Sequence, residues 1–184
     1  RIKVVTMEEK YRELERMRSE AEEIFKRCLR PVDPYGAVTR FVRLEGDRLL
    51  LGMEGQPKAD LDLDKFERIS LVGAGKATAP MAGAIEQMFG NRLQKGIINV
   101  KYGFTEDLKL TEITEAGHPV PDENSVKGTV KILDFLEGAG EKDLIFSLIS
   151  GGGSALLCQP AGDITLSEKQ DITKKLLACG ASID

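Results

Sequence analysis

The stretch LIFSLISGGGSALL, residues 144–157, places an apolar run directly before two serines that enclose three glycines. A nearly continuous apolar run is typical of a parallel strand that is covered on both faces of its sheet. Glycine inside a regular element costs about 0.5–1 kcal/mol relative to alanine, so three in a row need a reason. Gly151, Gly152 and Gly153 form either a tight turn or a cradle of bare backbone that receives a ligand.

From Arg68 onward, short β-rich runs alternate with helical runs and glycine-marked turns. The pattern predicts strands at 68–75, 95–103, 111–117 and 143–150, and helices at 77–89, at 122–138 and after Ser167, where Gln170 completes a capping box. The inner side of the helix at 122–138 is expected to carry Val126, Val130, Leu133 and Phe135 or Leu136. Alternating strands and helices favour an α/β fold with an open, mostly parallel sheet and helices on both faces.

The N-terminal third of the chain predicts a long helix and a short hairpin. Residues 7–30 carry one apolar stripe at spacings of three and four, which indicates a helix that packs on a core or on a partner. A turn is expected at 33–36, and two short strands are expected within 41–52 around Gly46 and Asp47. Residues 55–66 are expected to form a polar connector. The stripe consists of Tyr11, Leu14, Met17, Ala21, Ile24, Phe25 and Cys28.

Composition excludes several classes of partner. The net charge of −4 gives no overall attraction for nucleic acid or anionic lipid, and there is no tryptophan to stack on bases. No apolar run reaches the roughly 18–20 residues of a membrane span, so we expect neither nucleic acid nor membrane as a partner. Three cysteines without a CxxC pair indicate reduced thiols and a cytoplasmic location.

The first of three unusual loops presents Lys76 at the start of a predicted helix, directly after Gly73, Ala74 and Gly75. This loop matches neither a P-loop nor a dinucleotide fingerprint, because Thr78 stands where the fingerprint needs a small residue. A cation at a helix N-terminus is repelled by the helix dipole, and a bound anion would remove that conflict. We favour an anion-contacting role for Lys76 over that of a solvated surface lysine.

The second and third loops add a histidine and a row of amides. His118, the only histidine, is flanked by Gly117 and Pro119, which could hold its ring in one pose; a purely structural role in the turn stays open. A single histidine does not indicate a metal site.

The loop Ser150–Ser154 follows a buried strand and offers consecutive amides that can form an anion-binding nest. Ser154 does not fit a nucleophile elbow, because Leu156 stands where that motif has glycine.

From the residues alone, the prediction is an α/β domain that binds a small phosphorylated or anionic molecule. An isomerase or lactonase of sugar phosphates would fit these residues as well as a phosphotransferase. A module that binds anions or sugar phosphates without catalysis also stays open.

Three segments in this order, LVGAGKATAPMAGAIE (71–86), EAGHPVPDENSV (115–126) and LISGGGSALL (148–157), resemble the N-terminal domain of the two-domain glycerate 2-kinase family. This family is also labelled by its MOFRL C-terminal domain and as hydroxypyruvate reductase. The resemblance extends from Tyr11 to Asp184. It implies that residues 1–184 form a Rossmann-like N-terminal domain and that ATP phosphorylates D-glycerate to 2-phosphoglycerate with Mg²⁺.

Carried onto this sequence, the resemblance places catalytic roles on Lys76 and His118. The residues expected to bind substrate or phosphate are Gly73, Gly75, Ser150, Gly151, Gly152, Gly153 and Ser154; no metal ligand is assigned. The family's C-terminal domain, which forms the other wall of the cleft, is missing from this sequence. We therefore expect the chain to fold but to have little kinase activity alone. A homodimer stays open, and hydroxypyruvate reductase is the alternative activity.

Overall fold

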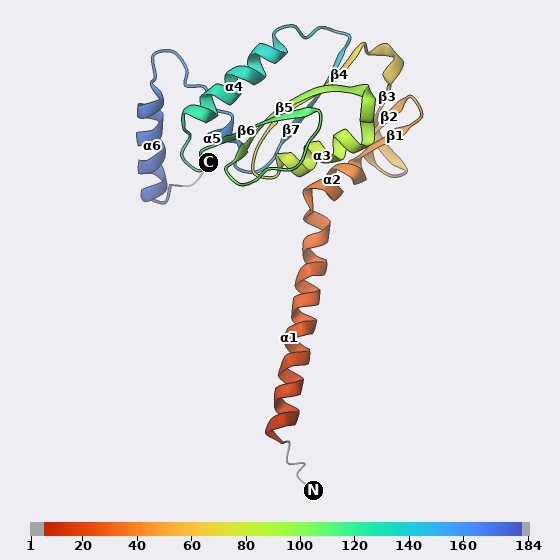
Figure 1. Ribbon diagram of the computed structural model, residues 1–184, viewed down its shortest axis with the longest axis vertical. Coiled ribbons are helices and arrows are strands. Elements are labelled where there is room, and N and C mark those ends of the chain that lie inside the picture. The colour runs from red at the N-terminus through yellow and green to blue at the C-terminus, as the bar shows by residue number, and fades with distance from the viewer. Residues whose placement is uncertain (1–5, 182–184) are drawn as a thin grey trace.

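The computed structural model describes residues 6–181, and a parallel sheet of four strands lies at its centre (Figure 1). The strands are β4 (Arg68–Ala74), β5 (Leu93–Lys101), β6 (Thr111–Ala116) and β7 (Asp143–Ile149). Across the sheet they follow the order β6–β5–β4–β7, so the chain adds β5 and β6 on one side of β4 and then returns to its other side. This is the order of the first four strands of a doubly wound sheet, and it creates a switch point between β4 and β7.

Helices cover both faces of this sheet, as predicted. They are α3 (Thr78–Phe89), which is joined to β5 by the 3-10 turn η3 (Gly90–Arg92), and α4 (Glu123–Leu136). Leu71 points to the α3 side and packs in the same cluster as Ile85. Val72 points to the opposite face and packs with Ile132 of α4. The alternation along β4 therefore feeds two separate cores, one under each helix.

The buried face of α4 agrees with the predicted one in part: Phe135 and Leu136 pack on the core cluster as expected, and Val126 is half-buried. Val130 and Leu133 are 39% and 44% exposed, whereas the residues that the helix buries are mostly small: Ser125, Gly128, Thr129 and Ile132. The helix lies so close to β5 that a Cβ added to Gly128 would collide with the side chain of Asn99. Apolar periodicity does not detect a face that is built for such a close approach.

The prediction that β7 is covered on both faces holds only for its first half, where Leu144 and Phe146 pack on the α3 side and Ile145 packs on the α4 side. Among the described strands, β7 pairs only with β4 and is an edge strand. Leu148 is its one fully buried residue, and Ser147 and Ile149 are exposed. An apolar run of this length does not distinguish a central strand from an edge strand.

A second, antiparallel sheet precedes the central one and replaces the predicted hairpin and connector. Its strands are β1 (Val42–Glu45), β2 (Arg48–Met53) and β3 (Gln56–Asp62), followed by the 3-10 turn η2 (Leu63–Lys65). The expected polar connector at 55–66 therefore contains a third strand. Its polar residues lie on the exposed side, where Asp60 forms an ion pair with Arg48 at 2.6 Å.

The turn expected at 33–36 is instead the beginning of helix α2 (Pro34–Phe41). Asp33 is its N-cap and accepts a hydrogen bond from the amide of Gly36 at 2.6 Å. Asp followed by Pro suits both a turn and a helix N-terminus. Residues 37–41 continue as helix because Val38 is buried in the core under α3.

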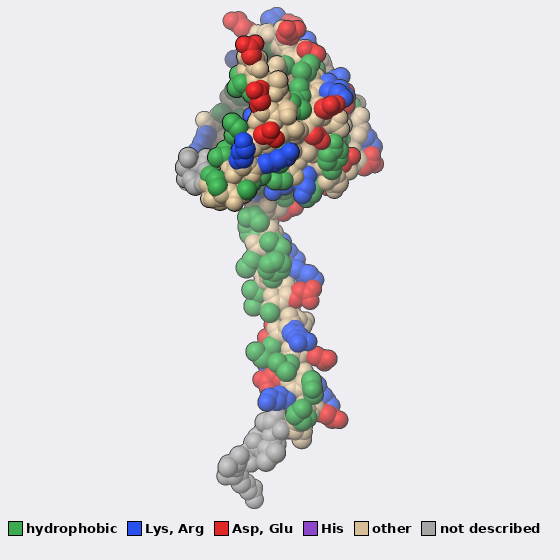
Figure 2. Space-filling view, turned by 90° about the vertical axis from the view of Figure 1, so that its left-hand side faces the viewer, with side chains coloured by type: hydrophobic (Ala, Val, Ile, Leu, Met, Phe, Trp, Pro, Cys, Tyr) green, Lys and Arg blue, Asp and Glu red, His purple; other side chains and the backbone are tan. Residues whose placement is uncertain are grey.

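Helix α1 (Met7–Leu29) extends away from the rest of the molecule, to which the 3-10 turn η1 (Arg30–Val32) joins it (Figure 1). The predicted helix at 7–30 is confirmed, but α1 has no buried residue and does not pack on the core. Its apolar side chains stay exposed along its length (Figure 2), for example Tyr11 at 62% and Phe25 at 63%. Whether a partner covers this stripe stays a prediction.

The chain after β7 forms the short helix α5 (Gly153–Leu156) and then α6 (Leu166–Ala178). The capping box of α6 is Thr165 with Glu168, two residues before the predicted Ser167 and Gln170.

Cys158 is buried, Cys28 and Cys179 are exposed, and all three thiols are free. Within residues 6–181, none of the helices is both long and apolar enough to cross a membrane.

Candidate functional site

Lys76 and His118 converge on Gly152. A Cβ built on Gly152 would lie 2.5 Å from Nε2 of His118 and 3.2 Å from Cε of Lys76, so both side chains approach the same bare backbone position. Gly152 has a φ of +82°, which favours glycine for conformational reasons as well. The three loops selected from the sequence therefore meet in one place.

The sheet order explains this convergence only in part. Lys76 follows β4 and Gly152 follows β7, which is its neighbour, whereas His118 follows β6 at the opposite edge. The loop that carries His118 reaches back over the carboxyl ends of the strands. Beneath it, Leu156 of α5 packs with Ala74 and Ala116 in a small buried cluster. The site lies at the switch point, where ligands bind in open α/β sheets.

Ser150 joins two loops by hydrogen bonds: residues 73–78, which we call the lysine loop, and residues 150–154, which we call the glycine loop. Its hydroxyl oxygen accepts a hydrogen bond from the amide of Ala77 at 3.0 Å and lies 3.4 Å from the hydroxyl of Thr78. Gly75, with a φ of +139°, leaves no room for a side chain, since an added Cβ would overlap the Ser150 hydroxyl. The serine side chain thus occupies the space that the missing side chain of Gly75 leaves free.

The loop of His118 is held at its C-terminal end by hydrogen bonds to Pro121 and Asp122. Asp122 caps α4 by accepting from the amide of Ser125 at 2.9 Å, and it also accepts from the hydroxyl of Tyr102 at 2.8 Å. The side-chain amide of Gln170 in α6 donates to the carbonyl of Pro121 at 2.8 Å. Burial raises the pKa of Asp122, but the hydrogen bonds that it accepts outweigh burial and lower the pKa overall. Asp122 therefore stays a carboxylate that fixes the loop.

The environment of His118 favours the neutral imidazole. Burial lowers the pKa of His118 below its ordinary value of 6.5, and the positive charges of Lys76 and Lys101 lower it further. A neutral ring can accept a proton or a hydrogen bond. The half-buried side chain therefore suits a proton acceptor next to a cation.

The remaining residues of the predicted site divide into packed and open positions. An added Cβ on Gly73 would clash with the carbonyl of Leu148, so this glycine allows β4 and β7 to approach each other. Gly151 has free space around it, Gly153 opens α5, and Ser154 is exposed. Gly151 and Gly153 flank Gly152, on which Lys76 and His118 converge.

Two residues of β5 that the sequence analysis did not select also belong to this region. Asn99 is fully buried, its amide donates to the carbonyl of Leu156 at 2.9 Å, and its backbone carbonyl accepts from the amide of Gly75 at 3.1 Å. It thereby links the lysine loop to the end of the glycine loop. Lys101 is the last residue of the same strand. Asn99 is a polar residue within a buried apolar strand, and Lys101 is a cation at the end of that strand. These two features could have identified them from the sequence.

The described residues do not form a magnesium site by themselves. Residues 6–181 contain no group of three or more His, Cys, Asp or Glu side chains that could hold a metal ion. Asp122, in the loop of His118, already accepts hydrogen bonds from Tyr102 and Ser125. Mg²⁺ usually binds one or two protein carboxylates together with water and substrate phosphates.

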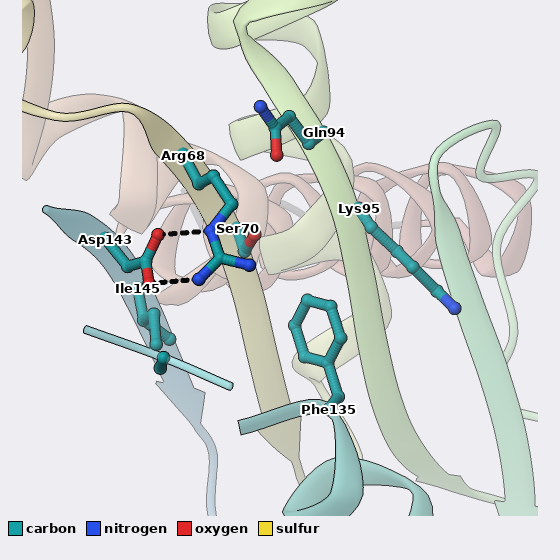
Figure 3. A pocket seen from close by; sticks show the side chains of 8 residues that line it. Arg68, Ser70, Gln94, Lys95, Phe135, Asp143 and Ile145 are labelled. Carbon is teal, nitrogen blue, oxygen red and sulfur yellow. Dashed lines mark hydrogen bonds and ion pairs between the residues drawn. The ribbon is translucent and has the colours of Figure 1, made fainter. Parts of the chain in front are cut away.

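A separate small pocket lies at the opposite, amino-terminal edge of the sheet (Figure 3). Its volume is about 90 Å³, and Arg68 and Asp143 form a paired contact at one side, with the Phe135 ring at the other. Arg68 bridges β4 and β7 through Asp143 and also donates to the carbonyl of Gly138 at 2.7 Å. These contacts explain the pocket as part of the packing between the strands and α4.

The sequence matches the family model described as "Domain of unknown function (DUF4147)" over residues 20–184. The chain belongs to this family. The DUF4147 match begins within α1 and includes all three loops of the site. It leaves the first half of α1 outside the family pattern.

Relatives confirm the resemblance to glycerate kinases. A D-glycerate 2-kinase from Thermotoga maritima is 42% identical over 132 residues, which are 71% of this chain and 30% of that protein. The crystal structure of glycerate kinase from Thermotoga maritima superimposes with a TM-score of 0.69 at 37% identity, over 92% of this chain and 36% of the other. A protein from Agrobacterium vitis, provisionally named hydroxypyruvate reductase, is 46% identical over 116 residues, 63% of this chain and 26% of its own. The chain thus spans about a third of the length of these relatives.

Proposed function

We propose that this chain forms the N-terminal part of a glycerate kinase, which transfers a phosphoryl group from ATP to D-glycerate and yields 2-phosphoglycerate and ADP. The convergence of Lys76 and His118 on Gly152 carries the proposal. Phosphoryl transfer depends mainly on positioning and on neutralising charge, so it needs cations and amides more than a nucleophile. The name of the Thermotoga maritima relative supports the choice of D-glycerate as substrate.

Each part of the site has a proposed role. Lys76 neutralises charge on an anionic oxygen, and the amides of Gly151, Gly152 and Gly153 cradle it. His118, neutral because of its lowered pKa, accepts the hydrogen bond or the proton of the substrate hydroxyl. Ser154 adds a hydroxyl at the rim.

Ser150, Gly73 and Gly75 serve the same site through its geometry. Ser150 holds the lysine loop against the glycine loop through Ala77. The two glycines permit the close approach that this requires. These three residues thus position the groups that contact the ligand.

The partners follow from the same proposal. We propose that Mg²⁺ accompanies the phosphates of ATP and that a C-terminal region like that of the longer relatives forms the opposite wall of the site. A homodimer is compatible with the exposed stripe of α1. The three free thiols support a cytoplasmic location.

The test is ATP-dependent conversion of D-glycerate by the natural full-length protein and by its Lys76→Gln variant. We expect 2-phosphoglycerate to form and Lys76→Gln to lower kcat/KM by about 100-fold or more, as removal of one charge-stabilising group often does. Lys142→Gln is the matched control, because Lys142 is exposed and pairs with Glu67. Normal turnover by Lys76→Gln, or no product with the unmodified protein, would contradict the proposal.

The alternative activity is hydroxypyruvate reductase, which the provisional name of the Agrobacterium vitis relative favours. It requires a dinucleotide site, and Thr78 replaces the third small residue of that fingerprint. Hydroxypyruvate-dependent oxidation of NADH, measured on the same preparation, would establish this activity instead.

A further inference from the structure

Lys101 lies at the same edge of the sheet as Lys76 and His118. In the register of β5 and β6 it lies beside Ala116, and His118 follows two residues further along the chain. Alternation along β5 places its side chain on the same face as Asn99, whose amide contacts the carbonyl of Leu156 in α5. Lys101 therefore lies on the face of the sheet that carries α5, at the strand end beside the loop of His118, and Lys76 reaches Gly152 from the end of β4.

The charge of Lys101 acts on the site. Its side chain is half-buried, and Nζ lies 5.1 Å from the centroid of the Phe104 ring, which holds the ammonium group near the strand end. Among the influences on His118, Lys101 lowers the histidine pKa next after burial and Lys76. Both ammonium groups are thus close enough to the imidazole to affect its protonation.

Neither lysine is neutralised by a carboxylate. Across residues 6–181, Lys76 and Lys101 take part in no ion pair. Lys131 and Lys142, by contrast, pair with Glu112 at 2.6 Å and Glu67 at 2.5 Å. Two cations without a carboxylate partner in residues 6–181 therefore act on the same imidazole.

We propose that Lys101 is a second binding residue of the site and that Lys76 and Lys101 together hold a phosphate group over Gly152. This inference rests on the proposed function. It specifies that the group bound at Gly152 is a phosphate and that a second cation, Lys101, helps to bind it. Two cations match the two negative charges of a phosphate better than the single charge of a carboxylate. The carboxylate of the hydroxy acid therefore binds elsewhere, and a phosphate occupies the glycine loop.

The single histidine gives a direct probe. The Hε1 proton of His118 gives the single histidine Hε1 resonance of this chain in the NMR spectrum, and inorganic phosphate and acetate can be titrated separately while this resonance is followed. We expect phosphate to bind at least tenfold more tightly than acetate. Bound phosphate should raise the pKa of His118, because an anion favours the charged imidazole.

Variants of the two lysines locate the binding groups. Lys101→Gln and Lys76→Gln should each weaken phosphate binding by about tenfold or more, since each removes one charge-assisted contact. Lys101→Arg should restore most of it, and Lys142→Gln should stay within twofold of the unmodified chain. In the absence of phosphate, Lys101→Gln should also raise the pKa of His118, because it removes a positive charge that lowers this pKa.

Phosphate binding by Lys101→Gln within twofold of the unmodified chain would overturn the proposal, as would equal affinity for phosphate and acetate. Denaturation curves of each variant show whether it is folded and can be compared. Loss of kinase activity in the full-length assay, with these binding results intact, would overturn the proposed reaction and leave the phosphate site in place.

Discussion

The hydroxyl oxygen of Ser150 accepts a hydrogen bond from the backbone amide of Ala77 at 3.0 Å, across 73 residues of sequence. This contact joins the end of β7 to the residue that precedes α3. Because Gly75 has no side chain, the Ser150 hydroxyl fits against its backbone. The loop geometry therefore depends on a serine and a glycine that belong to different loops.

Gly75→Ala should be strongly destabilising. The new Cβ would overlap the Ser150 hydroxyl and lie 2.8 Å from its carbonyl oxygen, and the φ of +139° is unfavourable for alanine. We expect the free energy of unfolding to fall by about 2–4 kcal/mol, as measured by urea denaturation. Gly151→Ala is the control, because nothing lies within 4 Å of its added Cβ; its effect should stay within about 0.5 kcal/mol. Equal effects of the two substitutions would contradict this account.

Gly152→Ala should affect ligand binding more than it affects folding. Its Cβ would meet the ends of the His118 and Lys76 side chains, which can move away. We expect a loss of about 1–2 kcal/mol in stability from the positive φ, together with at least tenfold weaker phosphate binding by titration calorimetry. If Gly152→Ala binds phosphate as Gly151→Ala does, the convergence at Gly152 is not part of the binding site.

Stability should depend on pH through His118. Its pKa in the folded chain is lowered from 6.5, so the unfolded chain takes up the proton first as the pH falls. The unmodified chain should therefore lose stability relative to His118→Gln as the pH falls from 6.5 through the lowered pKa, and the difference should be constant above pH 7. Denaturation midpoints at pH 8, 6.5 and 5 measure this. An opposite trend would mean that folding raises the histidine pKa.

Removal of residues 1–29 should leave the rest of the fold intact. No residue of α1 is buried, and its ion pairs, such as Lys26 with Glu22, lie within the helix. We expect the melting temperature of the truncated chain to change by no more than about 2–4 °C, which corresponds to a stability change of less than about 1 kcal/mol. A large drop would show that the stripe of α1 is covered in solution, and sedimentation velocity would then report the partner copy.

Helices and strands with a clear apolar periodicity could be predicted from the sequence. Faces that are buried because small residues allow close packing could not. The strand at β4 and the helix at α3 follow from an apolar run, glycines and a proline in the first helical turn. The face of α4 could be predicted only in part: Phe135 and Leu136 pack on the core as expected, but Gly128 is buried for its size and not for its hydrophobicity. The short strand β3 carries mostly polar residues, so only its pairing with β2 reveals it.

The members of the site could be predicted, but their arrangement could not. Glycine-rich segments at strand ends indicated Lys76, His118 and the loop Ser150–Ser154, because few other roles suit such residues there. Which strands adjoin depends on pairing across the sheet, and no local pattern shows that His118 reaches back from the edge strand β6 to Gly152. Lys101 was overlooked for the same reason, since it ends an apolar strand without a glycine motif of its own.

The return of the chain to β4 determines when the site can exist during synthesis. Arg68 of β4 pairs with Asp143 of β7 in the parallel register, and residues up to the end of β6 leave the ribosome before β7 does. A nascent chain that ends before β7 already contains Lys76 and His118, but it lacks the backbone of Gly152 on which they converge. Among the described strands β7 emerges last, and the loop that follows it supplies the backbone position that Lys76 and His118 share. These two side chains therefore acquire their common neighbour only after the chain has returned to pair with β4.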